Sequence, residues 1–148
     1  MTQATKLNIL KYGAIGLIGF GLLNFLSLLP VMRPLMGWFM NFAFWTPFGS
    51  DHQVAADTAR LWIAISGGLL AGWGATLLLV TTQVFPLDPA VGRRIVLSGI
   101  LTWFLIDSAG SVVAGAPFNV VMNLSFLVLF ALPVASPMEQ SVAATQTA

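Results

Sequence analysis

The stretch IVLSGILTWFLIDSAGSVVAGAPFNVVMNLSFLVLFALPV, residues 95–134, contains a single charged side chain, that of Asp107. A helix needs roughly 20 apolar residues to cross a hydrocarbon core about 30 Å thick, so this stretch is long enough to cross a membrane twice. Proline removes a backbone donor and disfavours helical backbone in the preceding residue, so Gly115-Ala116-Pro117 predicts a tight turn. The stretch therefore predicts two membrane-spanning helices, at about residues 95–114 and 118–134.

The composition of the whole chain also indicates a membrane protein. Of its 148 residues, 57% are hydrophobic and 7% are charged, whereas soluble domains contain about 45–50% apolar and about 25% charged residues. We expect residues 1–135 to form a single membrane domain in contact with the lipid bilayer. The six basic residues are scattered and form no basic stripe, so nucleic acid is not an expected partner.

Two further uncharged runs, residues 12–32 and 61–82, are also long enough to cross a membrane. The first run follows Lys6 and Lys11 and superficially resembles a signal peptide, but it is too long for one and no small-x-small cleavage site follows it. We therefore expect an uncleaved first span. The tail, residues 136–148, has too little apolar content to pack and is predicted to be disordered.

The aromatic segment PLMGWFMNFAFWTPF, residues 34–48, is uncharged and allows two interpretations. It could be a fifth crossing, or an interfacial or re-entrant helix between the first two spans. Leu35, Trp38, Phe42 and Trp45 recur at helical spacing, and Trp favours the membrane interface, so the interfacial interpretation is preferred.

The distribution of basic residues gives the same preference. Four spans place four basic residues on one side and two on the other, whereas five spans divide them equally. Because basic residues concentrate in cytoplasmic loops, we expect a four-transmembrane-helix bundle in a bacterial-type inner membrane, with both termini and the tail cytoplasmic. The cytoplasmic set would be Lys6, Lys11, Arg93 and Arg94, opposite Arg33 and Arg60.

Two short patterns predict helix starts. Ser50-Asp51-His52-Gln53 has the spacing of a capping box, so the second spanning helix is expected to begin at about residue 51. Asp88-Pro89 has the pattern of an N-cap followed by proline at the first helical position.

Counting residues from the cytoplasmic ends of the spans predicts a buried polar cluster. Asp107 and Asn24 are each the thirteenth residue of their spans, and Asn123 is the twelfth from the end of the last span. These side chains should lie at one depth near mid-membrane, and Ser111 follows Asp107 by one helical turn. An isolated carboxylate there is costly, so we expect Asp107 to be largely protonated and hydrogen bonded to the amides.

This cluster has a structural and a functional interpretation. A neutral Asp can simply tie helices together, which would suit a non-catalytic structural or accessory subunit of a membrane assembly. Intramembrane acids also mark proton and cation pathways, so the alternative is a small transporter or channel that uses Asp107. A further alternative is a lipophilic ligand stacked on Trp73 and Trp103.

Small residues in the second span predict close helix packing. Gly68 and Gly72 form a GxxxG pattern, and Gly67 and Ala71 form a second small stripe beside it. The partner could be a helix of the same chain or of a second copy, which would make a homo-oligomer.

The sequence offers no support for catalysis, a metal site or a bound cofactor. It has no cysteine, and its one histidine lies near too few other ligands for a metal site. It also contains no glycine-rich phosphate loop. We therefore expect a protein that is not an enzyme.

Overall fold

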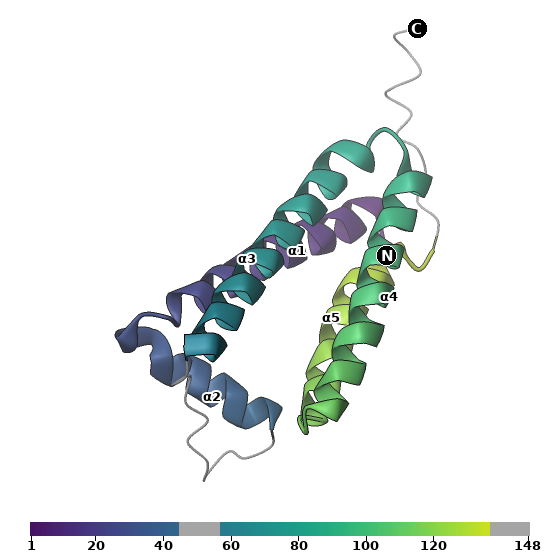
Figure 1. The fold of residues 1–148 in the computed structure, drawn as a ribbon. Coiled ribbons are helices and arrows are strands. Elements are labelled where there is room, and N and C mark those ends of the chain that lie inside the picture. The colour runs from purple at the N-terminus through teal and green to yellow at the C-terminus, as the bar shows by residue number, and fades with distance from the viewer. Residues whose placement is uncertain (45–56, 137–148) are drawn as a thin grey trace, which may run out of the picture.

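The computed structural model describes residues 1–44 and 57–136, and every regular element in them is helical (Figure 1). A short 3₁₀ turn, η1, precedes α2, and a π-helical turn, η2, continues α3. The elements are α1 (Gln3–Leu26), η1 (Pro30–Met32), α2 (Arg33–Ala43), α3 (Asp57–Leu79), η2 (Val80–Val84), α4 (Pro89–Val113) and α5 (Phe118–Val134).

Three of these helices are long and apolar enough to cross a membrane: α1, α3 together with η2, and α4. The fourth apolar helix, α5, has 17 residues and is shorter than the other three. The protein is thus an all-helical membrane protein with three candidate spans among the described residues. The predicted bundle of four spanning helices requires that α5 also crosses the membrane.

The first helix is displaced relative to the predicted span. It begins at Gln3 and ends at Leu26, whereas the apolar run continues to residue 32. The hydroxyl of Ser27 donates to the carbonyl of Asn24 at 2.6 Å, and Pro30, which has no backbone N–H, starts η1. The hydropathy of the sequence therefore predicts where the apolar run ends, but not where the helix ends.

Other predicted boundaries follow the local signals. The Asp88 carboxylate accepts hydrogen bonds from the backbone N–H groups of Ala90 and Val91, both at 3.0 Å, and α4 begins at Pro89. The turn between α4 and α5 has Gly115 at φ +79°, a conformation that favours glycine. The predicted capping box and the end of the aromatic segment, residues 45–53, lie outside the described residues, as does most of the tail.

The helices α1 and α3 form a pair whose backbones touch. A Cβ atom on Gly67 would lie 2.8 Å from the carbonyl oxygen of Gly21 and 2.9 Å from the backbone nitrogen of Phe25. A Cβ atom on Gly21 would in turn meet the backbone of Ala71. The structure therefore places Gly67 and Ala71 against α1.

The neighbouring pattern on α3 faces away from this contact. Gly68 and Gly72 are exposed, and no heavy atom of the described residues lies within 4 Å of a Cβ built on either one. The packing within the chain that the GxxxG pattern allowed is not seen at these two positions. The reason is geometric, since adjacent residues of a helix point about 100° apart and only one stripe can face α1.

The second pair, α4 and α5, is antiparallel and joins the first mainly through α1 and η2. Phe85 follows η2 and is buried beneath Gly92, and Phe130 of α5 packs against Gly13 of α1. Figure 1 shows α3 and α4 connected at the η2 end and apart at the other, where α2 extends from the first pair toward the second.

Two basic side chains fasten the end of α5. Arg93 Nε donates to the backbone carbonyl of Val134 at 2.7 Å, and Lys6 Nζ donates to Ser136 Oγ at 2.5 Å. Cations stabilise the carbonyl end of a helix because its unpaired carbonyls carry partial negative charge. The N-terminus of α1, the start of α4 and the end of α5 are therefore joined at one end of the bundle.

Arg93→Met should lower the free energy of unfolding by about 1 kcal/mol, because the carbonyls at the end of α5 lose their donor. Arg94→Met is the matched control, since Arg94 is exposed and makes no hydrogen bond with the described residues. Thermal unfolding in detergent measures both variants. Equal loss in the two would show that Arg93 does not cap α5.

Gly67→Ala should lower the free energy of unfolding by about 1–3 kcal/mol, because the new methyl group meets backbone atoms that have no room to shift. Gly68→Ala should be neutral or stabilising, because alanine favours helix and the site is open. The midpoints of thermal unfolding of the two variants compare the adjacent positions directly. Similar losses in both would contradict the observed α1–α3 contact.

Candidate functional site

A polar network centres on the carboxylate of Asp107, in the C-terminal half of α4. One oxygen, Oδ2, accepts a hydrogen bond from Asn123 Nδ2 at 2.6 Å and a second from Asn119 Nδ2 at 3.3 Å. Both asparagines lie on α5, one turn apart. The carboxylate is therefore held by two neutral amide donors from the neighbouring helix.

Two serines complete the network. Asn123 Nδ2 also donates to Ser108 Oγ at 3.2 Å, and Asn119 Nδ2 donates to Ser111 Oγ at 2.9 Å. The hydroxyl of Ser111 donates to the backbone carbonyl of Asp107 at 2.8 Å. Each amide thus divides its two protons between the carboxylate and a hydroxyl of α4.

The hairpin geometry explains why these residues meet. Asp107 and Asn123 are each eight residues from Gly115, and Ser111 and Asn119 are each four residues from it. In an antiparallel pair of helices, positions equally distant from the turn lie at the same height. Side chains four residues apart also share a helix face, so the network needs only one face of α4 and one of α5.

The other carboxylate oxygen is left available. Within residues 1–44 and 57–136, Asp107 forms no ion pair, and Oδ1 accepts no hydrogen bond. An intramembrane carboxylate without a cationic partner is costly. The chain therefore supplies neutral donors at Oδ2 and no cation at Oδ1.

Asp107 lines an inner cavity of about 200 Å³ between the two helix pairs. The polar side chains of the lining come from both pairs, with Asn24 on α1 and Ser66 on α3 joining the network residues. The apolar part of the lining consists of four aromatic side chains and three aliphatic ones: Phe20, Phe39, Trp103, Phe126, Leu17, Leu70 and Met122.

The three residues that the depth count grouped, Asn24, Asp107 and Asn123, thus line one cavity, although they are not all bonded. The side chain of Asn24 makes no hydrogen bond with any described residue. Asn24 therefore faces the network across the cavity from the other helix pair.

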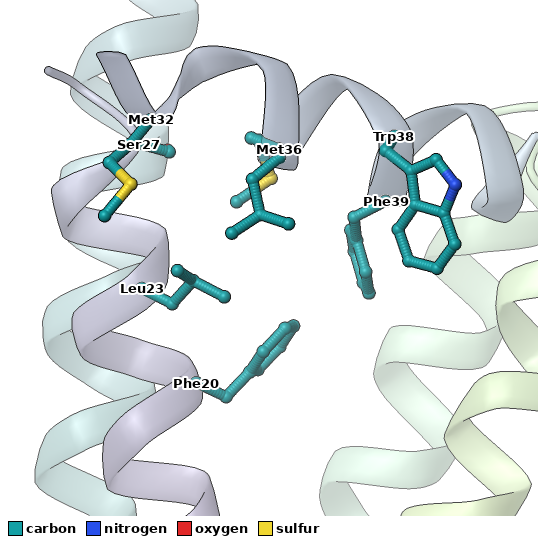
Figure 2. A pocket seen from close by; sticks show the side chains of 8 residues that line it. Phe20, Leu23, Ser27, Met32, Met36, Trp38 and Phe39 are labelled. Atoms are coloured by element: carbon teal, nitrogen blue, oxygen red, sulfur yellow. The ribbon is translucent and has the colours of Figure 1, made fainter. Parts of the chain in front are cut away.

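A second, outer cavity of about 440 Å³ lies on the α2 side of Asp107. Phe39, Asp107 and Asn119 line both cavities and so separate them. Phe39 is also part of a small apolar pocket of about 90 Å³ between α1 and α2, where it lies over Phe20 (Figure 2). The centroids of these two rings are 5.3 Å apart.

The two tryptophans proposed for ligand stacking contact each other. The ring centroids of Trp73 and Trp103 are 5.6 Å apart, and Trp73 also lies 6.2 Å from Phe130. Trp103 lines the inner cavity, whereas Trp73 is not part of its lining. Only one of the pair is therefore placed to contact a molecule beside Asp107.

Sequence reasoning did not include Asn119 or Ser108 in the cluster. Asn119 lies in the first turn of α5, away from the midplane position used to select candidates. Its distance from Gly115, equal to that of Ser111, was the signal that could have found it. Ser108 follows Asp107 directly and is reached because Asn123 lies over both residues.

The described residues contain no group of three or more His, Asp or Glu side chains that could hold a metal ion. Comparison of the chain with known protein families, with curated proteins and with solved structures found no match. The Asp107 network and its cavity are therefore the features of the described residues from which a function can be inferred.

Asn123→Leu should lower the free energy of unfolding by about 1–2 kcal/mol, because Asp107 and Ser108 lose a donor in an apolar environment. Asn24→Leu is the matched control: the same change at a residue that lines the same cavity without a hydrogen bond should cost much less. Thermal unfolding of both variants tests the difference. A larger loss for Asn24→Leu would contradict the assigned network.

Proposed function

We propose that this chain is a non-catalytic protein of a bacterial-type inner membrane, a structural or accessory subunit whose α4–α5 hairpin is braced by Asp107. The observation that carries the proposal is the pair of hydrogen bonds from Asn119 and Asn123 to Asp107 Oδ2. A single carboxyl group among amides and hydroxyls has no nucleophile–base pair of the kind that group-transfer enzymes require.

The brace has a clear physical role between apolar helices. No hydrophobic effect drives helices together within lipid, so packing and interhelical hydrogen bonds set their register. Such bonds contribute about 0.6 kcal/mol each on average and up to about 1.7 kcal/mol. The two amides bond Asp107, Ser108 and Ser111, which makes sliding or rotation of α5 along α4 unfavourable.

We propose four crossings, with α5 as the fourth. Its 17 residues span about 25 Å, somewhat less than a hydrocarbon core, and it runs antiparallel beside α4. The 11 residues of α2 span only about 16 Å, which suits a helix that lies at the interface. Its Met36 and Ala43 are buried whereas Trp38 is exposed, as expected of an amphipathic interfacial helix.

The ends of the bundle support cytoplasmic termini. Lys6 and Arg93 lie together at the end that holds the N-terminus of α1 and the C-terminus of α5. Arg94 is adjacent in sequence, and Arg33 lies at the opposite end, at the start of α2. The larger basic group would therefore face the cytoplasm.

The outward face of α3 is the surface that we propose for assembly with copies of the chain or with a larger membrane complex. Gly68 and Gly72 are exposed there with open space around them. Small residues at this spacing permit another helix to approach closely. This surface is separate from the Gly67 contact that joins α3 to α1.

The brace predicts opposite outcomes for two substitutions of Asp107. Asp107→Asn keeps the shape and an acceptor oxygen, so the fold and the assembly should persist. Asp107→Leu removes the acceptor of both amides and should lower the free energy of unfolding by about 2–3 kcal/mol. Thermal unfolding and native mass spectrometry from a mild membrane mimetic report stability and subunit number. Indifference to both substitutions would refute the brace.

A further inference from the structure

We propose that the inner cavity binds a small organic ammonium ion, a protonated amine on a compact aromatic or aliphatic body, with Asp107 Oδ1 as its counter-charge. This inference goes beyond the brace, which involves only Oδ2. It also does not depend on the proposed assembly surface.

The charge balance of the site is the first argument. Oδ2 receives two neutral N–H donors, which suit an acceptor oxygen, while Oδ1 receives no donor from the described residues. A neutral carboxyl group is expected of Asp107 when it stands alone, and a bound ammonium group would supply the positive charge that favours the ionised form. It would also supply N–H donors for Oδ1. Asn24 lines the same cavity from α1 with its side chain unbonded, so its amide oxygen is available as a second acceptor.

The shape and lining of the cavity give the class of ligand. A closed protein cavity of about 150 Å³ binds benzene, so about 200 Å³ accommodates a body of one ring. Phe20, Trp103 and Phe126 line the same cavity as Asp107. Aromatic faces attract ammonium groups, whereas an inorganic cation needs several converging oxygen ligands.

The outer cavity provides the way in. It adjoins the inner cavity at Asp107, Asn119 and Phe39, and is bounded by α2 and the end of α4. A ligand that enters beside α2 passes Asp107, Asn119 and Phe39, which line both cavities. The ring of Phe39, held over Phe20, lies at this junction.

The test uses phenethylammonium as the probe and phenethyl alcohol as its neutral counterpart. Isothermal titration calorimetry on the full chain in lipid nanodiscs, with empty nanodiscs subtracted, measures both. The ammonium should bind at least about tenfold more tightly, because charge-assisted hydrogen bonds are roughly twice as strong as neutral ones. Equal affinities, or no saturable binding of the ammonium, would overturn the proposal.

Two matched serine variants locate the binding. The Ser66 and Ser125 hydroxyls each donate to the backbone carbonyl three residues earlier, but only Ser66 lines the inner cavity. Ser66→Leu fills the cavity without touching the Asp107 network and should weaken ammonium binding at least about tenfold. Ser125→Leu, at an exposed position, should leave binding unchanged. Binding that survives Ser66→Leu would place the probe elsewhere and refute the assignment.

Competition distinguishes the class of cation. Sodium chloride and potassium chloride at equal ionic strength should affect the ammonium affinity equally, because neither inorganic cation packs against the aromatic lining. Selective displacement by sodium would make this an inorganic cation site and overturn the organic assignment.

Asp107→Asn should abolish the preference for the ammonium over the alcohol, with circular dichroism to verify the fold. A preference that persists in this folded variant would also refute the role of Asp107.

Discussion

The hydrogen bonds that Asn119 and Asn123 donate to Asp107 Oδ2 are the constraint on which the arrangement of α4 and α5 depends. A carboxyl group among apolar helices is stable only when the protein supplies its hydrogen-bond partners, because an apolar environment supplies none. All the donors come from one helix, α5, so the partners are in place only when the hairpin closes in one register. Gly115 at φ +79° permits that closure, and the equal spacing of donors and acceptor around the turn makes the register specific.

The two helix pairs are held by different physical means, and the cavity follows from that difference. The first pair, α1 and α3, packs backbone against backbone where Gly21 and Gly67 leave no room for a Cβ atom. The second pair is held by the Asp107 network, and contacts between the pairs run mainly through α1, α5 and η2. The side chains that fill the space between the pairs near α2 are aromatic rings and amides, which leave an inner cavity of about 200 Å³ beside Asp107.

The sequence could group residues by their position along the helices, whereas it could not predict rotation about the helix axis. Counting residues placed Asn24, Asp107 and Asn123 at one level, and these residues line one cavity. The α4–α5 turn was predicted because glycine and proline act on the local backbone. A helix that is hydrophobic on all sides has no periodic pattern that indicates which face packs against its neighbour. The sequence therefore could not predict that Gly67, and not Gly68, contacts α1. Asn119 is missing from the predicted cluster for the same reason, because its hydrogen bond depends on which face of α5 meets Ser111. The end of α1 was placed too late because hydropathy does not report the hydrogen bond that Ser27 makes to Asn24.

The brace and the proposed ligand site make compatible demands on one carboxyl group. Amide donors fix Oδ2 and thereby fix the position of Oδ1, which is the kind of preorganisation that lowers the entropic cost of binding. A carboxylate held by flexible side chains would have to be ordered by the ligand itself. A carboxylate held by a cationic side chain would have its charge already neutralised, so a second cation would gain little. Neutral donors on one oxygen therefore fix the position of Asp107 and add no positive charge that would compete with a bound cation. The same residue is thus suited to holding a hairpin and to recognising a cation.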